Sequence, residues 1–215
     1  MAKVLVTGFE PFGGEATNAA WEAVKQLAGS QPEGMEVAVA QLPTVFGRSV
    51  EALKQAVRDA QPDVVISVGQ AAGRKEITPE RVAINVDDAR IPDNAGHAPI
   101  DKPIVPEGPA AYWSTLPIKA IVRDIREAGI AAAVSNTAGT YVCNHLFYGL
   151  AHLLATEYPQ IRGGFIHVPL IPEQAEGRPD MPSMPLGSIV QGLAIAISTS
   201  VRVERDIEEE GGRIS

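Results

Sequence analysis

The sequence predicts a single α/β domain, with a mostly parallel, twisted central sheet between two layers of helices. Three observations predict this fold class. Short aliphatic runs alternate with amphipathic stretches along the 215 residues, which is typical of repeated strand–helix–strand units. Hydrophobic residues make up 45% and charged residues 20% of the chain, as in ordinary folded globular proteins. No repeat, low-complexity tract or composition break divides residues 1–215, so we expect one domain.

The first third of the chain contains three predicted strands and two predicted helices. The strands are short apolar runs, at residues 3–8, 35–42 and 63–68. Thr17 or Asn18 can cap the first helix, which continues to Leu27 and which Gly29 stops. The second helix covers residues 48–60, where apolar side chains recur on one helical face.

The rest of the chain continues the alternation after one long interruption. Residues 76–88 have the pattern of an extended segment, and residues 89–117 are rich in proline and lack periodicity. A loop of that length in a compact domain is usually functional or an interface. The remaining predicted elements are helices at residues 118–129, 143–158 and about 186–207, and strands at 131–135 and 164–168.

Charge and cysteine content exclude several classes of partner. A net charge of −8 and a pI near 5.0 argue against nucleic acid or an anionic membrane, because either needs a basic face. The single cysteine excludes an intrachain disulfide and favours a reducing, cytoplasmic setting. The first apolar run is too short for a signal peptide. Residues 181–201 lack charge, but their prolines and serines favour a core helix over a membrane span.

The only thiol, Cys143, lies where residues 134–144 leave a predicted strand, pass a glycine turn and enter a helix. Unpaired N–H groups and the positive dipole end at a helix N-terminus favour a thiolate over a thiol. The same N–H groups can bind an oxyanion. A lone cysteine is nevertheless more often an inert core residue, so a nucleophile needs further support.

A thiol nucleophile usually needs an imidazole, and the chain offers four. His145 follows Cys143 by two positions on the same predicted helix, so the two side chains point to different faces. His152 packs or faces solvent farther along that helix, and His97 lies in the proline-rich segment, where a surface role is expected. His167 lies near the carboxyl end of a predicted strand, where parallel sheets place their sites. Its position makes His167 the first candidate.

The third member of such a site is an acid that fixes the imidazole tautomer. Glu80 lies in an otherwise apolar extended segment, which is an unusual position for a carboxylate. A surface ion pair with Arg81 would also explain it. From the residues alone both interpretations stay open, with Asp87, Asp88 and Asp93 as alternative acids.

Two long motifs contain these candidates. Residues 69–85 read GQAAGRKEITPERVAIN, and residues 135–144 read SNTAGTYVCN. The first resembles the glutamate signature and the second the cysteine signature of the pyroglutamyl peptidase I (pyrrolidone carboxyl peptidase) family of cysteine peptidases. The similarity extends through residues 8–12, 85–94 and 167–169 in the same order. It therefore covers nearly the whole chain.

The resemblance implies a role for each matching position. Cys143 would be the nucleophile, His167 the general base and Glu80 the acid that orients it. Arg90 would help the backbone N–H of Cys143 to hold the oxyanion. The residues that would line the pyroglutamyl pocket are Phe9, Phe12, Thr44, Gln70, Ile91 and Val142.

The resemblance also implies the activity and the assembly. The family has a phosphorylase/hydrolase-like α/β/α sandwich fold. Its members are omega-peptidases that hydrolyse the amide bond after an N-terminal pyroglutamyl residue, through an acyl-enzyme and without a cofactor or metal. We therefore expect N-terminally pyroglutamylated peptides as substrates. The same resemblance implies a homo-oligomer, a tetramer or a dimer.

The chemistry of this substrate suits the residues. A pyroglutamyl group is a neutral, flat lactam without a free ammonium group. Its recognition calls for apolar walls and one or two backbone hydrogen bonds. Phe9 and Phe12, beside the glycines of residues 13–14, would supply such walls, although ordinary packing would also explain them.

Parts of the sequence also suit three other classes of protein. A nucleoside phosphorylase has a similar sheet, and residues 8–14 and 69–73 could cradle phosphate. Neither loop contains the Lys-Ser/Thr of a P-loop, no GxGxxG occurs, and Cys143 would be unexplained. A non-catalytic binding module would often have lost one of the three candidate catalytic residues. A metalloenzyme has the least support, because the sequence contains no HExxH, no second cysteine and no two histidines at ligand spacing.

Overall fold

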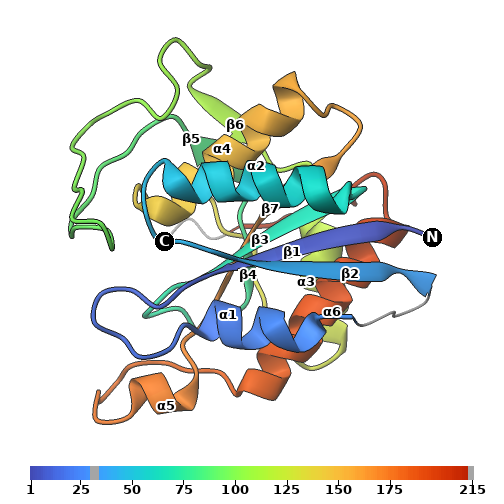
Figure 1. Cartoon of the computed structure of the whole chain (residues 1–215). Coiled ribbons are helices and arrows are strands. Elements are labelled where there is room, and N and C mark those ends of the chain that lie inside the picture. The colour runs from blue at the N-terminus through green and yellow to red at the C-terminus, as the bar shows by residue number, and fades with distance from the viewer. Residues whose placement is uncertain (30–33, 213–215) are drawn as a thin grey trace.

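A five-stranded sheet forms the centre of the molecule (Figure 1). The computed structural model describes residues 1–29 and 34–212. The strand order is β2-β1-β3-β7-β4. The four parallel strands are β1 (Lys3–Phe9), β2 (Glu36–Leu42), β3 (Val64–Gln70) and β7 (Arg162–Val168). The short β4 (Thr78–Pro79) pairs antiparallel with β7 at one edge.

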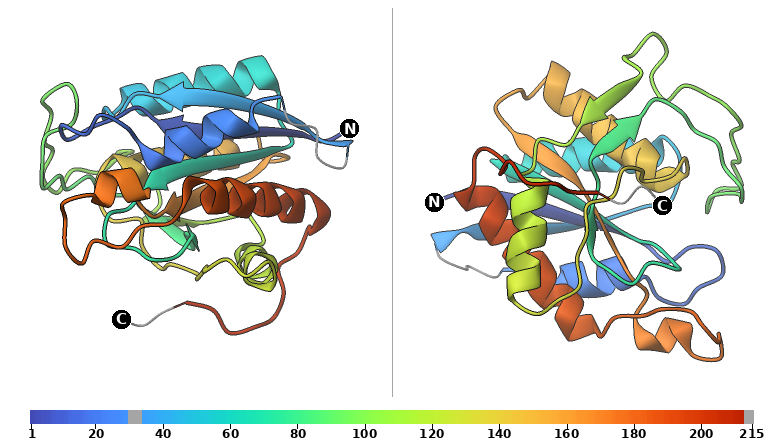
Figure 2. Two further views of the ribbon diagram at one scale, coloured as in Figure 1. Left: turned by 90° about the horizontal axis from the view of Figure 1, so that it is seen from below. Right: turned by 180° about the vertical axis from the view of Figure 1, so that it is seen from behind.

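Helices cover both faces of this sheet (Figures 1 and 2). One face carries α1 (Ala19–Val24), α3 (Ile118–Glu127) and α6 (Leu186–Arg202). The other face carries α2 (Arg48–Ala60) and α4 (Val142–Thr156). A 3₁₀ turn, η1 (Lys25–Leu27), follows α1, and the short α5 (Pro172–Ala175) follows β7. The predicted α/β fold with a mostly parallel sheet is confirmed.

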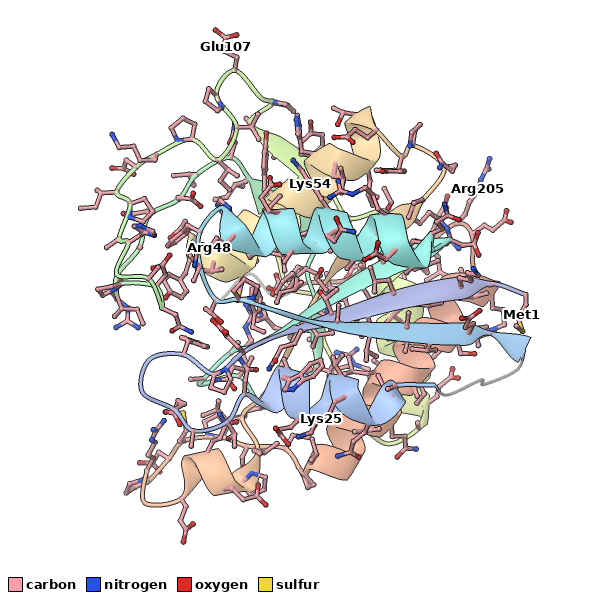
Figure 3. All side chains as sticks on the ribbon, in the orientation of Figure 1. Met1, Lys25, Arg48, Lys54, Glu107 and Arg205 are labelled. Carbon is pink, nitrogen blue, oxygen red and sulfur yellow. The ribbon has the colours of Figure 1, made fainter. Side chains whose placement is uncertain are left out.

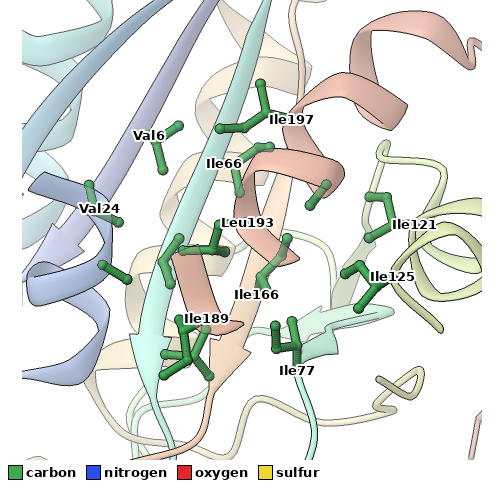
Figure 4. Packing of buried hydrophobic residues seen from close by; sticks show 14 of the residues in the cluster. Val6, Val24, Ile66, Ile77, Ile121, Ile125, Ile166, Ile189, Leu193 and Ile197 are labelled. Carbon is green, nitrogen blue, oxygen red and sulfur yellow. The ribbon is translucent and has the colours of Figure 1, made fainter. Parts of the chain in front are cut away.

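Alternation along the strands divides the apolar side chains between two cores. On β7, Ile166 and Val168 join the core beneath α1, α3 and α6 (Figure 4), whereas Phe165 joins the core beneath α2 and α4. Each fully buried side chain of this size contributes about 1.5–3 kcal/mol. His167 has the same parity as Phe165 and lies beside its ring, with centroids 4.9 Å apart. The strand pattern therefore turns His167 toward α4, the helix that carries Cys143.

Several element ends agree with the sequence and others do not. Asn18 caps α1 by accepting a hydrogen bond from the N–H of Ala20, so Asn18 rather than Thr17 is the cap. The predicted strand at residues 131–135 forms only isolated bridges, one from Ala132 and one from Ser135. A strand needs a partner along its whole length, and the adjacent β4 is only two residues long.

The last helix also ends earlier than predicted, at Arg202 instead of near Ile207. The following segment crosses to α3, where the carboxylate of Asp206 accepts hydrogen bonds from the N–H groups of Lys119 and Ala120. The N-cap residue of α3, Pro117, has no capping side chain, so Asp206 supplies the cap from a distant part of the chain. Within residues 1–29 and 34–212, none of the helices has the length and apolarity needed to span a bilayer.

The proline-rich excursion contains a strand that the sequence did not predict. β6 (Ala111–Trp113) pairs antiparallel with β5 (Val82–Ile84) in a separate two-stranded sheet. The side chain of Asn85 fastens the base of the excursion, because it both accepts from the N–H and donates to the carbonyl of Val105. Figure 3 shows this segment projecting from the body of the molecule, with Glu107 at a tip.

Candidate active site

Cys143 lies in the first turn of α4, the helix that begins at Val142. The N-cap residue, Tyr141, makes no side-chain capping bond, so no cap competes for the N–H groups of this turn. Cys143 as a whole is partly exposed, and its thiol rests on β3 at Gly69, where an added Cβ would lie 3.0 Å from Sγ and 2.8 Å from the Phe165 ring. A glycine at position 69 therefore makes room for the thiol.

His167 is the register partner of Gly69 on the adjacent strand β7, so the imidazole and the Cys143 thiol flank the same place in the sheet. His167 Nδ1 lies 2.7 Å from Oε1 of Glu80. Both side chains are buried, with Glu80 0% exposed. The backbone N–H of Glu80 donates to the carbonyl of Phe165, which holds the acid alongside β7.

The contact with Glu80 fixes the tautomer of His167. Because Nδ1 faces the carboxylate, the proton of the neutral ring lies on Nδ1 and Nε2 is an acceptor. Nε2 has no hydrogen-bond partner in the described part of the chain, and neither has Sγ of Cys143. Catalytic hydrogen bonds are often long before substrate binds, and an imidazole with an open Nε2 can accept the proton of a thiol.

Burial shifts the pKa of both the Cys143 thiol and the His167 imidazole. Burial, and to a smaller extent the Glu80 carboxylate, raise the pKa of the Cys143 thiol to about 12, although the charge of Arg74 lowers it. Burial also lowers the pKa of His167 below its ordinary value, against the hydrogen bond from Glu80. Both shifts favour the uncharged forms of the pair, a thiol and a neutral imidazole. The direction of the Cys143 shift is opposite to the one expected from the helix N-terminus, because burial disfavours the charged form of the sulfur.

Arg74 is the residue of this cluster that sequence reasoning missed. Its Nη1 lies 2.6 Å from Oε1 of Glu80 and also donates to Oγ1 of Thr78. Its Nη2 donates to the carbonyl of Thr137 over 3.0 Å. A basic residue within the Glu80 motif was the available signal, but the spacing of residues 69–85 does not say which cation meets the acid.

The alternative explanation of Glu80 as a surface residue paired with Arg81 is wrong. Arg81 instead donates to Oδ1 of Asn136 and to the carbonyl of Gly211. The side chain of Glu80 is fully buried and contacts Arg74 and His167.

The other acids and histidines lie elsewhere. Asp87 pairs with His145, whose Nδ1 is 2.9 Å from Oδ2 of the acid. Asp93 accepts from backbone N–H groups of residues 46, 95 and 97, and Asp88 is exposed. The side chain of His97 is 65% exposed beside Asp93, as expected for a surface residue. His152 pairs through Nδ1 with the hydroxyl of Tyr112.

Two of the predicted pocket residues, Phe9 and Phe12, are aromatic and lie at and just after the end of β1. Phe9 is buried at the end of β1 and packs on Phe165, with ring centroids 6.4 Å apart. Phe12 is partly exposed, and its ring lies 6.1 Å from that of Tyr141. Tyr141 meets the ring of Phe46 edge-on at 5.5 Å. Tyr141 and Phe46 extend the aromatic surface and were not predicted, although Tyr141 is two positions from Cys143.

Two polar pocket candidates are engaged with the protein itself. The hydroxyl of Thr44 donates to the carbonyl of Glu10. Oε1 of Gln70 accepts from the N–H of Ala19 and from the side chain of Gln174. Both side chains are therefore already engaged within the protein.

The remaining predicted residues divide between core and surface. Val142 is buried at the start of α4, and Ile91 is half-buried in the excursion. Arg90 is exposed, and its side chain makes no hydrogen bond or ion pair within the described ranges. Among those residues, no group of three or more His, Cys, Asp or Glu side chains is placed to hold a metal ion.

Comparison with known sequences assigns the family. Residues 2–203 match the family model for pyroglutamyl peptidase. A pyrrolidone-carboxylate peptidase of Brevibacillus brevis is 57% identical over 215 residues, which is 100% of both chains. Another from Bacillus licheniformis is 58% identical over 213 residues, 99% of each chain.

Solved structures agree with the sequences. A crystal structure of pyroglutamyl peptidase I from Bacillus amyloliquefaciens superposes with a TM-score of 0.96 at 54% identity, covering 97% of this chain and 99% of that one. A mutant pyrrolidone carboxyl peptidase from Pyrococcus furiosus superposes with a TM-score of 0.89 at 45% identity, covering 93% and 98%. The chain therefore belongs to the pyroglutamyl peptidase family.

Proposed function

We propose that Cys143, His167 and Glu80 are the nucleophile, general base and orienting acid of this cysteine peptidase, which removes N-terminal pyroglutamyl residues from peptides. The observation that carries the proposal is the 2.7 Å contact between His167 Nδ1 and Glu80, which leaves Nε2 open. The thiol of Cys143 rests on Gly69, the register partner of His167. These positions support a proton path from the thiol to the imidazole, with the acid on the far side of the ring.

The reaction starts from the uncharged pair. As Sγ of Cys143 attacks the pyroglutamyl carbonyl carbon, the S–H proton passes to Nε2 of His167 and the carbonyl oxygen becomes an oxyanion. The carboxylate of Glu80 stabilises the imidazolium that forms. The imidazolium then protonates the leaving amine, the C–N bond breaks and a thioester remains. Water attacks the thioester while Nε2 takes its proton, and the proton returns to sulfur as pyroglutamate leaves.

The oxyanion needs donors, and two are proposed. The backbone N–H of Cys143 lies in a helical turn without a side-chain cap. The guanidinium of Arg90 is exposed in the excursion and is not held by other side chains of the described ranges. We expect Arg90→Ala to lower kcat by about 10- to 1000-fold, the usual effect of losing one oxyanion donor.

The pyroglutamyl pocket is proposed to consist of Phe9, Phe12, Thr44, Gln70, Ile91 and Val142. The aromatic contact between Phe12 and Tyr141 supports a flat apolar wall next to the nucleophile. Because the side chains of Thr44 and Gln70 are already hydrogen-bonded, the backbone near them would pair with the polar edge of the lactam. Val142, directly before Cys143, offers a further backbone group there.

Selectivity tests the pocket. Prolyl substrates lack the ring carbonyl and carry a charged amine, and glutaminyl and glutamyl substrates carry an ammonium group. A site built on specific hydrogen bonds discriminates by about 10⁴ or more, whereas shape alone gives about 10- to 200-fold. We expect kcat/KM for pyroglutamyl anilide to exceed that for the other three anilides by the larger factor. Comparable rates on prolyl and pyroglutamyl anilides would remove the pocket proposal.

A matched pair of variants tests the aromatic wall. Phe12→Ala is expected to weaken use of the pyroglutamyl anilide without making the other three good substrates. Tyr158→Ala is the control, because Tyr158 is, like Phe12, a partly exposed aromatic residue, and it follows the C-terminal end of α4. Equal losses in the two variants would contradict a specific role for Phe12.

The reaction class is tested by alkylation. Release of a chromogenic amine from a pyroglutamyl anilide should stop after treatment with iodoacetamide and should be unaffected by a chelator. Because Cys143 is the one cysteine, alkylation reports on that residue alone. Activity that survives complete alkylation would exclude the cysteine mechanism.

A homo-oligomer, a dimer or a tetramer, is also proposed. Two large apolar side chains of the excursion are exposed, Ile100 at 67% and Trp113 at 69%. Trp113 lies on β6, a strand of a two-stranded sheet, and an exposed strand edge is a surface on which a second copy can pair. Analytical ultracentrifugation of the wild type and of Trp113→Ser tests this, with a lower mass expected for the variant.

The domain organisation is inferred from the two cores, and the cellular location from the thiol. Residues 1–215 are proposed to fold as one domain, since β3 and β7 contribute to both cores. A single cooperative melting transition is the expected result. A cytoplasmic location is proposed because the free thiol of Cys143 must stay reduced to act.

A further inference from the structure

The carboxylate of Glu80 is in an unusual electrostatic position. It is fully buried, and its Oε1 receives both His167 Nδ1 at 2.7 Å and Arg74 Nη1 at 2.6 Å. Its Oε2 has no hydrogen-bond partner among residues 1–29 and 34–212. A buried carboxylate that is not compensated takes up a proton instead of keeping its charge. With His167 neutral, Arg74 is the cation that contacts Glu80.

Arg74 is itself held in place from two further sides. Nη1 also donates to Oγ1 of Thr78 on β4, and Nη2 donates to the carbonyl of Thr137 in the segment that leads to α4. The guanidinium thus joins three segments of the site: the loop after β3, the strand before Glu80 and the turn before Cys143. Its side chain is 25% exposed, so the charge is not fully removed from water.

We propose that Arg74 is a positioning residue of the reaction, which pairs with the buried carboxylate of Glu80 and keeps it directed at His167. The inference rests on the proposed triad. In the described part of the chain Arg74 makes no hydrogen bond to the thiol or the imidazole, so it acts by its contact with Glu80 and by its charge. The sharing of Oε1 also weakens the pull of Glu80 on His167, because each donor draws on the same oxygen.

The proposal has a consequence for pH that a purely structural role lacks. The charged and titratable groups that face the Glu80–His167 pair are Arg74 from the loop after β3 and Cys143 from α4. The charge of Arg74 opposes a proton on the pair, and it lowers the pKa of His167 accordingly. Without that charge the pair binds its proton at higher pH. Since turnover requires Nε2 without a proton, the acid limb of the rate profile moves to higher pH.

The test compares three substitutions at Arg74. For Arg74→Met we expect kcat at neutral pH to fall by roughly 10- to 100-fold, while KM for pyroglutamyl anilide changes by less than about threefold. The acid limb of the kcat/KM profile should move to higher pH by roughly one unit or more. Arg74→Lys retains the charge and should keep the acid limb close to wild type. Arg74→Gln has an N–H donor without the charge and should shift the limb as Arg74→Met does. If circular dichroism shows that Arg74→Met does not fold, Arg74→Gln takes its place in the comparison.

Arg81→Met is the matched control, because Arg81 follows Glu80 directly and its guanidinium binds Asn136 and Gly211 instead of the acid. Its acid limb should stay in place. An unchanged acid limb in Arg74→Met and Arg74→Gln, or equal losses in Arg74→Met and Arg74→Lys, would overturn the proposal. Glu80→Gln is assayed in parallel. Full activity of Glu80→Gln would overturn the triad. An inactive Glu80→Gln together with unaffected Arg74 variants would overturn the role of Arg74 alone.

Discussion

Two buried histidine–carboxylate pairs lie on or next to α4, and they differ in whether Nε2 of the histidine has a hydrogen-bond partner. In both, Nδ1 of the imidazole meets the acid, at 2.7 Å for His167 with Glu80 and 2.9 Å for His145 with Asp87. Nε2 of His145 accepts a hydrogen bond from the N–H of Gly47 at 2.9 Å. Nε2 of His167 has no such partner within the described residues. A carboxylate partner therefore does not by itself make a histidine catalytic; an open second nitrogen is also required.

The pair of His145 with Asp87, the closed pair because both ring nitrogens are engaged, has a structural role instead. His145 connects α4 to the turn before α2 through Gly47, and its ring packs edge-on against Phe46, with centroids 5.4 Å apart. Phe46 in turn contacts Tyr141 at the start of α4. The pair of His145 with Asp87 thus holds the aromatic side of the site, while the pair of His167 with Glu80 is left free to exchange a proton.

The largest effects are expected at Cys143 and at His167, the histidine whose Nε2 is open. Cys143→Ala and His167→Ala should each lower kcat by roughly 10⁴-fold or more, because removing one member of a triad disables the unit. Cys143→Ser should be almost as inactive, since the base is matched to a thiol. Thermal melting should show that the fold survives. Appreciable turnover by the alanine variant of Cys143 would contradict the cysteine mechanism.

The two acids provide the second comparison. Glu80→Gln keeps the shape but cannot stabilise an imidazolium, so kcat should fall by roughly 10²- to 10⁴-fold. Asp87→Asn is the isosteric control at the closed pair and should lower kcat by less than about tenfold. Steady-state kinetics on the pyroglutamyl anilide distinguish the two. A larger loss in Asp87→Asn than in Glu80→Gln would reverse the assignment of the pairs.

A third prediction concerns stability. His145→Ala leaves the N–H of Gly47 and the carboxylate of Asp87 without their partner, so the free energy of unfolding should fall by about 3 kcal/mol. Urea denaturation measures this change, and kcat of the folded fraction should stay within about tenfold of wild type. His145→Gln can still accept from Gly47 and donate to Asp87, and should recover part of the loss. A fully stable alanine variant would argue against the structural role.

The smallest effect is a displacement of the pH profile. Burial lowers the pKa of His167, so the acid limb of kcat/KM should lie below the ordinary histidine value of about 6.5. The unfolded chain binds this proton more readily than the folded one, so stability should also fall as pH decreases through that range. Stopped assays between about pH 4 and 8 check the limb, and an acid limb well above 6.5 would show that His167 is not held neutral.

Local patterns allowed most elements to be predicted. The aliphatic run at β3, the one-sided apolar pattern of α2 and the Asn18 cap of α1 all depend on near neighbours, and the structure contains all three. The start of α4 at Cys143 was also predictable to within one residue. Where an element depends on a distant partner the prediction failed, as for residues 131–135 and for β6.

The sequence by itself determined the fold class, the family and the three side chains proposed for the chemistry. Only the tertiary structure decided which groups meet: Glu80 reaches His167 across 87 positions, Arg74 rather than Arg81 contacts Glu80, and Asp87 serves His145. It also decided the surroundings of the thiol, because burial and the Glu80 carboxylate raise the pKa of Cys143 to about 12. The physical reason is common to these cases. Periodicity and capping act over a few residues, whereas hydrogen-bond partners and desolvation are set by segments that are adjacent only after folding.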